Sequence, residues 1–512
     1  MKFSSLRSGA PRLTIPKAFG TGGILLVVAL LPLGWVLLGG MVAAGQITLE
    51  GRALLDAVEA RLWCRSLLLA LLAAGVSLAV GLPYGWLWAR GDIPLRRLWA
   101  AASLLPLLLP PYALVVAALY IEERSGVGLI SPAWSGLALG LPATVGTAAL
   151  VLAAGHWPAV AWLVALAARG VPRELEDAAR LSLSDRRAAW FAAWPSLWPA
   201  ALAGLTFVFL VAFANYSVGD SLGLPTYARE ILMRFKGDFS TATAARLGAA
   251  VLAVATPLVL LQRVWLTRVP LAPEGGDRLP YLPLGILRPA AAAFCAGVVL
   301  LTAALPVVAL IAQALDGGAL RLALTDGGEA LLQSGALAAG AAGLALALAL
   351  LAGALAVPTA SGQSASYLRP TALDAVVTLP YALPGALLAV GFVALLNRPG
   401  PMGNLYGTPA VLLWAYALLF LPYAYWVIVP AWQRIDPDLW DDAVLNGARG
   451  WDRWRHVLWP ALRGPALLAA ALVFLLAARE MDATVVLKPP GLYPLAYAVW
   501  DTLHFGSREE AA

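Results

Sequence analysis

Long runs of apolar residues alternate along the whole chain with short polar segments. Eleven runs stand out, near residues 22–45, 62–89, 98–121, 140–168, 197–217, 242–267, 289–315, 331–357, 371–396, 408–431 and 464–487. A helix needs about 20 apolar residues to cross ~30 Å of hydrocarbon, because each residue rises 1.5 Å along its axis. The pattern therefore predicts an all-α polytopic membrane protein with about eleven spans.

Basic residues distinguish one side of the predicted topology from the other. With a cytoplasmic N-terminus, the inward loops are 1–17, 90–97, 169–196, 263–288, 358–370 and 432–463, and they carry most of the 35 Lys and Arg residues. This bias is the one that the positive-inside rule requires. The basic residues that give the chain its net charge of +6 are scattered over these loops and do not form one patch. We therefore expect contact with a lipid bilayer and none with nucleic acid.

The chain divides near its middle into two similar halves. A proline-rich polar stretch at 267–288 separates a first repeat, 1–266 with about six spans, from a second repeat, 289–512 with about five. Pro172 matches Pro437 and Trp194-Pro195 matches Trp459-Pro460, at one constant offset of 265 residues. A constant offset indicates a tandem duplication. The second repeat ends where a twelfth span is expected, so we predict either eleven spans with an outward C-terminus or a sequence that stops early.

The matching residues belong to a loop on the cytoplasmic side of each repeat. The two copies are DAARLSLSDRRAAWFAAWPSL at 177–197 and DDAVLNGARGWDRWRHVLWPAL at 441–462. Carboxylates directly after a proline suit the first turn of a helix, and tryptophans at helical spacing follow them. Each loop is thus predicted to be a short helix, a break, and a second amphipathic helix that returns to the membrane. The simpler alternative is an interfacial helix that only anchors aromatic side chains at the headgroups.

The carboxylate, small-residue and glycine spacing of these loops resembles the "EAA" loop of permease subunits in binding-protein-dependent ABC importers. The second copy reads Asp441-Asp442-Ala443 with Gly447 at the glycine position, and the first reads Glu176-Asp177-Ala178-Ala179 without that glycine. The resemblance spans both repeats. It implies a tandem duplication of a type I importer permease unit, for which twelve spans are the family expectation.

The resemblance also implies function and partners. Two copies of a cytoplasmic ATP-binding subunit would dock on the loops, and an external binding protein, periplasmic or lipid-anchored, would deliver the cargo at a bacterial inner membrane. Fused permeases of this length look most like the ferric-iron group, with thiamine, polyamine and phosphonate relatives as alternatives. None of the lysines follows a glycine, so the chain has no phosphate-binding loop, and we expect neither enzyme activity nor a cofactor of its own. A secondary transporter with parallel repeats is the remote alternative.

Polar residues at matching places in the two repeats are candidates for the translocation path. These are Asn215, Tyr216 and Asp220 in the first repeat, and Glu480 and Asp482, after Arg479, in the second. A structural ion pair is the competing interpretation. The Pro-x-x-x-Pro pairs, Pro106/Pro110 and Pro380/Pro384, are expected to kink their helices and free backbone carbonyls toward a cavity.

The histidines and cysteines carry no recognisable metal spacing. His156, His456 and His504 are far apart in sequence, so we expect neither a metal site nor catalytic residues, and we interpret His156 as a packing residue. Cys64 and Cys295 lie in apolar runs and are expected to be buried thiols.

Overall fold

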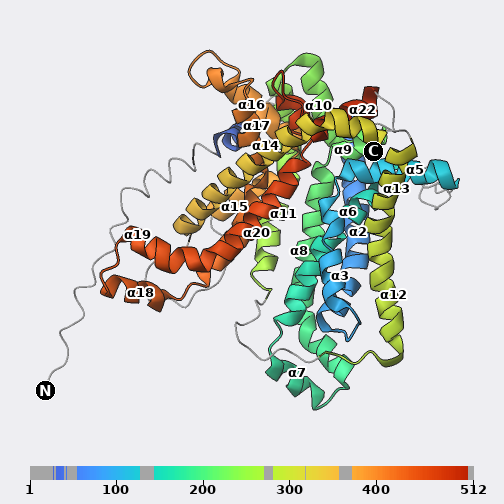
Figure 1. Ribbon diagram of the computed structural model, residues 1–512, viewed down its shortest axis with the longest axis vertical. Helices are drawn as coiled ribbons and strands as arrows, with labels where there is room; N and C mark the ends of the chain where they lie inside the picture. Colours follow the sequence, from blue (N-terminus) through green and yellow to red (C-terminus); the bar gives the residue numbers. More distant parts are fainter. Residues whose placement is uncertain are drawn as a thin grey trace.

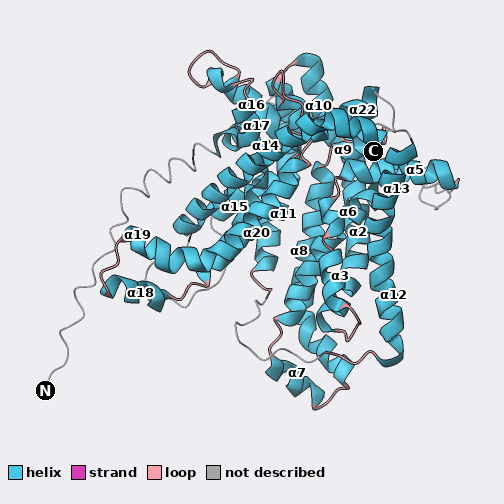
Figure 2. Cartoon of the chain, viewed as in Figure 1, coloured by secondary structure: helices cyan, strands magenta, loops and turns pink. Residues whose placement is uncertain are grey.

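The computed structural model describes residues 27, 30–39, 42, 55–126, 143–269, 281–316, 319–356 and 372–505, which contain helices and loops but no strand (Figure 2). The helices of the first repeat are α2 (Ala57–Arg90), α3 (Arg96–Ala102), α4 (Leu105–Leu108), α5 (Pro111–Ser125), α6 (Ala143–Arg169), α7 (Arg173–Arg180), α8 (Asp185–Ala214), α9 (Ser217–Ser221), α10 (Tyr227–Asp238) and α11 (Thr241–Leu266). Those of the second are α12 (Arg288–Val299), α13 (Leu305–Asp316), α14 (Ala319–Ala356), α15 (Ala372–Thr378), α16 (Gly385–Leu396), α17 (Pro409–Gln433), α18 (Pro437–Leu445), α19 (Gly450–Arg453), α20 (Trp459–Ala478), α21 (Thr484–Leu487) and α22 (Leu495–Phe505).

All eleven predicted apolar runs contain helix. Within the described residues, eight helices are long and apolar enough to cross a bilayer, and two further pairs would do so as bent spans. The run at 22–45 is described over Leu30–Gly39, which is helical. The run at 464–487 was predicted too long, since α20 ends at Ala478, where the polar sequence Arg479-Glu480-Met481-Asp482 begins.

The two Pro-x-x-x-Pro sequences break their helices, as the sequence predicted. The chain bends by 93° between Arg96–Leu108 and Pro111–Ser125, and by 113° between Asp374–Ala382 and Gly385–Leu396. Proline has no N–H to donate to the preceding turn, and its ring clashes with that turn, so a helix ends at such a position. Each repeat thus contains one span that is broken near its middle.

Close packing inside the first repeat depends on small residues. A Cβ at Gly85 of α2 would collide with the Ala161 carbonyl oxygen of α6, and a Cβ at Gly81 would lie 2.7 Å from the Val160 Cβ. These contacts allow the two backbones to approach closely along their length. Small residues have this use in membrane helices, where packing rather than hydrophobicity drives association.

The first span of each repeat packs against the other repeat. The 30–39 helix contacts α16, where a Cβ at Gly391 would lie 3.0 Å from the Pro32 carbonyl oxygen. In the other direction, α12 and α13 run along α2, α3 and α5, on the right of Figure 1, and Trp157 Nε1 donates to Thr302 Oγ1 at 3.2 Å. The repeats of the sequence are therefore interlocked in space.

Two sides of the molecule can be told apart in Figure 1. Helices α7, α18 and α19 lie at one end, and we call this end the loop side. Helices α9, α10 and α22 lie together at the other end, the opposite side. Toward the loop side, α18, α19 and α20 diverge from α7 and α8, and the helices come together at the opposite side (Figure 1).

Candidate functional site

The first repeated loop folds as predicted into two helices with a break between them. Helix α7 ends at Arg180, four residues form a turn, and α8 begins at Asp185. This second helix continues without interruption into the membrane span as far as Ala214. The turn does not need the glycine of the second copy. Leu181 keeps right-handed helical angles and Ser184 is extended, and both conformations are open to any residue.

Glu176 in this loop is turned into the protein. Its side chain has no exposed surface and pairs with Arg90, the last residue of α2, at 2.5 Å from Nη2 to Oε2. Arg180 reaches the other carboxylate oxygen at 2.8 Å. The Glu176 carboxylate is therefore used inside the protein, where it fixes α7 against α2.

The neighbouring Asp177 faces outward. Half of its side chain is exposed, and its contacts are surface pairs with Arg173 at 3.6 Å and Arg180 at 3.4 Å. Ala178 is exposed beside it and Ala179 is partly buried. Leu181, just after α7, is 88% exposed. The outer face of this loop is therefore formed by Asp177, Ala178 and Leu181.

The second loop turns at Gly447, as the sequence predicted. Gly447 has φ of +75°, and the Ala448 N–H donates to the Ala443 carbonyl at 2.9 Å. A left-handed residue followed by this bond is the usual glycine-dependent end of a helix. Asp442 is exposed and Ala443 partly buried, whereas the side chain of Asp441 lies outside the described residues.

A cavity of about 820 Å³ lies between the two repeats. Helices α6, α8 and α11 line it from the first repeat, and α17, α20 and the residues around the α15–α16 break line it from the second. Its lining extends from Leu266 and Val269, at the loop-side end of α11, to Arg479–Asp482 at the opposite side. Most of the wall is apolar, and polar groups gather in two places.

The first polar group lines the cavity at the opposite side. Arg479 Nη1 donates to the carbonyls of Leu107 at 2.7 Å and Leu109 at 2.9 Å. The Leu107 carbonyl has lost its helical donor, because the residue four positions on is Pro111. Arg479 of the second repeat therefore takes the place of the missing hydrogen bond in the broken span of the first.

Glu480 and Asn215 occupy equivalent positions at this end. The Ala483 N–H donates to Glu480 Oε1 at 2.9 Å, and the Val218 N–H donates to Asn215 Oδ1 at the same distance. The offset between the two pairs is again 265 residues. Each side chain thus holds the short turn that follows a long span, and the duplication keeps this local geometry.

Two acidic side chains in this group lie beyond the end of the α20 span. Burial raises the pKa of the Glu480 carboxyl above its usual range. Burial and the neighbouring Glu480 charge raise the pKa of the Asp482 carboxyl well above its usual range. Asp482 Oδ2 accepts from the Tyr216 N–H at 3.3 Å, which ties it to the first repeat. Both carboxyls are partly buried and line the cavity.

The second polar group joins the repeats nearer the loop side. Arg263 of α11 forms a buried ion pair with Asp374 of α15, with 2.5 Å between Nε and Oδ2. Next to Arg263, Gln262 Oε1 accepts from the Tyr381 hydroxyl, and Gln262 Nε2 donates to the Ala203 carbonyl at 3.0 Å. The broken span of the second repeat is therefore held by the first.

Aromatic rings from both repeats pack around this group. Phe207 of α8 stacks on Tyr381 with centroids 5.6 Å apart, and Tyr381 meets Trp426 of α17 edge-on at 5.0 Å. Tyr423 completes the cluster, 5.6 Å from Trp426. All four rings line the cavity.

The predicted path residues divide into two sets. Asn215, Pro380, Glu480 and Asp482 line the cavity. Tyr216 and Asp220 instead bond to each other at 2.6 Å, and Asp220 pairs with Arg229 at 2.8 Å, as the ion-pair alternative predicted. The other three prolines, Pro106, Pro110 and Pro384, do not line the cavity, although their neighbours Leu107, Pro111, Leu383 and Gly385 do. These prolines therefore bend the helices that form the wall and are not part of the wall itself.

Sequence reasoning missed some of the polar residues of the wall: Tyr112, His156, Gln262 and Arg263. The signal for the last pair was present, since a Gln-Arg dipeptide inside an apolar run is unusual and marks a buried polar contact. His156, interpreted as a packing residue, is 4% exposed and lines the cavity. Tyr112 gives no such signal, because aromatic residues are common throughout the apolar runs.

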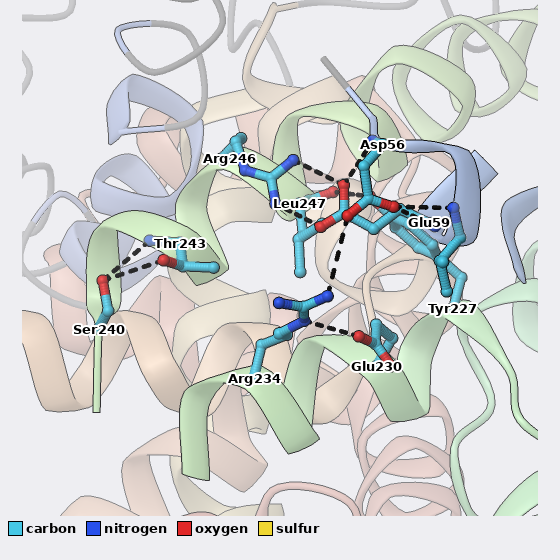
Figure 3. A network of polar contacts seen from close by, with 10 residues as sticks. Asp56, Glu59, Tyr227, Glu230, Arg234, Ser240, Thr243, Arg246 and Leu247 are labelled. Carbon is cyan, nitrogen blue, oxygen red and sulfur yellow. Dashed lines mark hydrogen bonds and ion pairs between the residues drawn. The ribbon is translucent and has the colours of Figure 1, made fainter. Parts of the chain in front are cut away.

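An ion-pair network on the opposite side fixes the starts of two spans (Figure 3). Arg246 of α11 reaches both oxygens of the buried Glu59 in the first turn of α2, with 2.7 Å from Nη1 to Oε2. Asp56 caps α2, accepting from the Glu59 N–H at 2.7 Å. Arg234 of α10 joins Glu230 at 2.7 Å and approaches Asp56 at 3.9 Å. The network is structural and stands apart from the cavity.

The cysteines differ from each other. Cys295 is buried, as expected, but Cys64 is exposed on α2, which corrects the prediction. An apolar run does not say which of its faces points away from the protein, and Cys64 is on such a face. Within the part of the chain that the structure describes, no group of three His, Cys, Asp or Glu side chains is placed to hold a metal ion.

Comparison with known proteins agrees with the resemblance. Residues 81–269, which include the first loop, match the family model of the binding-protein-dependent transport system inner membrane component. PhnV of Salmonella paratyphi A, assigned as a permease for 2-aminoethylphosphonate transport, is 30% identical over 27% of this chain and 52% of its own length. The Fe(3+)-transport system permease protein FbpB 2 of Haemophilus influenzae is 25% identical over 61% of both chains. The thiamine transport system permease protein ThiP of Brucella suis is 27% identical over 25% of this chain and 26% of its own length.

These relatives are matched over only part of their length, about half in the case of PhnV. The chain is about twice as long as a usual permease of this family, in agreement with a fusion of two copies. The apolar helices and the family match identify a multi-pass inner-membrane protein. Residues 81–269 of the chain are thus similar to the binding-protein-dependent transport system inner membrane components, a family of ABC permeases.

Proposed function

We propose that the chain is the membrane-spanning permease of an ATP-driven importer, with the cavity between its repeats as the translocation path. The observation that carries the proposal is the placement of two repeated loops on one side of a cavity whose other end is lined by polar residues. Two copies of a separate ATP-binding subunit dock on α7 and α18, and an external binding protein delivers cargo to the opposite side. ATP is bound by those subunits, not by this chain.

The geometry supports a division of labour within each loop. Asp177 and Asp442 are the exposed carboxylates and are available to basic groups of an ATP-binding subunit. Glu176 and Arg90 tie the first loop to α2, so a movement of α7 is passed to a membrane span. Gly447 lets the second loop turn sharply between α18 and α19.

Ferric iron is the proposed cargo, because the iron permease FbpB 2 is matched over 61% of both chains. Thiamine, polyamine or phosphonate cargo with the same mechanism is the alternative, and relatives assigned to thiamine and 2-aminoethylphosphonate transport are matched over shorter stretches. A secondary transporter needs ionisable groups for a coupling ion near mid-bilayer. The Arg263–Asp374 pair does not favour it, because the two charges neutralise each other near the end of α11.

The test is uptake of labelled ferric iron by iron-starved cells that lack this gene, with and without the chain restored. Labelled thiamine is the parallel measurement. We expect iron uptake to return with the chain and to be lost in the variant Asp442→Lys with Gly447→Pro, while membrane insertion is kept. Unchanged uptake in that variant would contradict the role of the loop. If the chain restores uptake of thiamine but not of iron, the proposed cargo is thiamine instead of ferric iron.

A further inference from the structure

The end of the cavity beside Arg479 contains polar atoms that the protein itself does not use. Tyr112 is 5% exposed and His156 is 4% exposed, and both line the cavity. Among the described residues, the Tyr112 hydroxyl has no hydrogen-bond partner, and His156 has one, at Nδ1. Buried polar groups are normally paired, so an unpaired one that faces a cavity indicates a ligand.

The tautomer of His156 follows from its one bond. Nδ1 lies 2.7 Å from the Leu152 carbonyl oxygen, which can only accept, so Nδ1 carries the proton. In a neutral imidazole the other nitrogen, Nε2, then has a lone pair and no hydrogen. His156 therefore offers the cavity an acceptor.

The carboxylates of this end also offer acceptors. Glu480 and Asp482 are each positioned by a backbone N–H, from Ala483 and Tyr216 respectively. One such bond uses one of about four lone-pair sites on an ionised carboxylate. The cationic group here, Arg479, donates through Nη1 to the carbonyls of Leu107 and Leu109, so this nitrogen closes the broken span.

We propose that the cavity end formed by Glu480, Asp482, His156 and Tyr112 is a transient site for a cation, and that it selects cationic over oxyanionic cargo. The inference rests on the proposed function and names the cargo class of the same cavity. A metal ion and an organic cation share the chemistry that the site recognises, namely positive charge that seeks oxygen and nitrogen lone pairs. An oxyanion would meet two carboxylates and an acceptor nitrogen against a single guanidinium, whose Nη1 is bonded to two backbone carbonyls.

The site is suited to passage rather than retention. No three metal-ligating side chains converge within the described residues, so an ion there is held by fewer groups than a resident metal requires. Transport needs binding that is favourable enough to admit the ion and weak enough to release it.

The experiment uses the full chain, restored to cells that lack its gene, and four labelled probes: ferric iron, thiamine, spermidine and 2-aminoethylphosphonate. Glu480→Gln and Asp482→Asn each remove a charge but keep an oxygen for the backbone bond that positions the side chain. Glu329→Gln is the matched control, because Glu329 is an exposed carboxylate of α14 that does not line the cavity. Membrane-inserted protein is quantified in every strain.

We expect uptake of one cationic probe, reduced at least about tenfold by Glu480→Gln or Asp482→Asn and unchanged by Glu329→Gln. Uptake of iron would identify the cargo as a metal ion, and uptake of thiamine or spermidine would identify it as an organic cation. If a cation is taken up and neither substitution reduces its uptake, the proposed cation site is wrong, while the proposed importer function stands. Uptake of 2-aminoethylphosphonate alone would overturn the cation class and leave the importer. Uptake of no probe by correctly inserted chain would reject the proposed cargo set, and this inference with it.

Discussion

Two adjacent carboxylates in the first loop are expected to respond in opposite ways to neutralisation. Glu176 is fully buried and 2.5 Å from the guanidinium of Arg90, which is 1% exposed. Asp177 is half exposed and its nearest basic atom is 3.4 Å away. Glu176→Gln and Asp177→Asn are the same chemical change made one residue apart, so they differ in environment alone.

The expected magnitudes follow from burial. Removal of one partner from a buried pair leaves an uncompensated charge and costs about 3–5 kcal/mol. An exposed pair contributes about 0–1 kcal/mol, because water and salt screen it. Glu176→Gln keeps an oxygen that can accept from Arg90, but it removes the negative charge and leaves the buried guanidinium uncompensated, so we expect a loss within the larger range.

The assay is reversible unfolding of the purified chain in detergent micelles, followed by tryptophan fluorescence. Arg90→Met, Glu176→Gln and the double variant complete a double-mutant cycle, whose coupling energy measures the pair. We expect both single variants to lower the free energy of unfolding strongly and the double variant to recover part of the loss. Asp177→Asn should be close to wild type in stability, while ATP-driven uptake falls.

Two results would refute this reasoning. Equal stability losses for Glu176→Gln and Asp177→Asn would show that burial does not separate the two carboxylates. A coupling energy near zero would show that Arg90 and Glu176 do not act as a pair.

Three further predictions concern packing, the broken span and pH. Gly85→Ala places a methyl group against the Ala161 carbonyl and should destabilise by about 1–3 kcal/mol, measured by thermal unfolding. Arg479→Met leaves two carbonyls of the α4–α5 break without their donor and should cost about 1–3 kcal/mol for each, measured the same way. Folding raises the pKa of Glu480 and of Asp482. At a pH between the unfolded-state and the folded-state pKa of these carboxyls, the folded chain therefore binds more protons than the unfolded chain. Stability should therefore rise as the pH is lowered through that window and fall as it is raised.

Each of these has a matched control. Gly75→Ala lies in the same helix with nothing within 4 Å of the new methyl group, so it should not destabilise. Arg398→Met removes an exposed arginine instead of Arg479. The pH slope should flatten in the Glu480→Gln, Asp482→Asn double variant. The other charged groups that face these carboxyls, Arg479 and Asp220, remain in both proteins, so the difference between the two slopes reports Glu480 and Asp482.

Local features of the fold were predictable because they depend on neighbouring residues. An apolar run of sufficient length must form a helix in a bilayer, since no water is present to satisfy its backbone. The breaks at Pro110–Pro111 and Pro384 follow from the missing N–H of proline, and the turn at Gly447 follows from the freedom of glycine at positive φ. The offset of 265 residues also relates Asn215 to Glu480, which the structure places in equivalent turns.

The sequence by itself determined the helical membrane class, the duplication, the two loops and the places where spans break. Only the tertiary structure decided which of two adjacent carboxylates is buried, that Arg479 completes a broken span more than three hundred residues away, and that the first span of each repeat packs on the other. Periodicity identifies an apolar stretch but not the neighbour that covers each face. A buried charge depends on a partner from another helix, and the position of that partner is a property of the packed molecule.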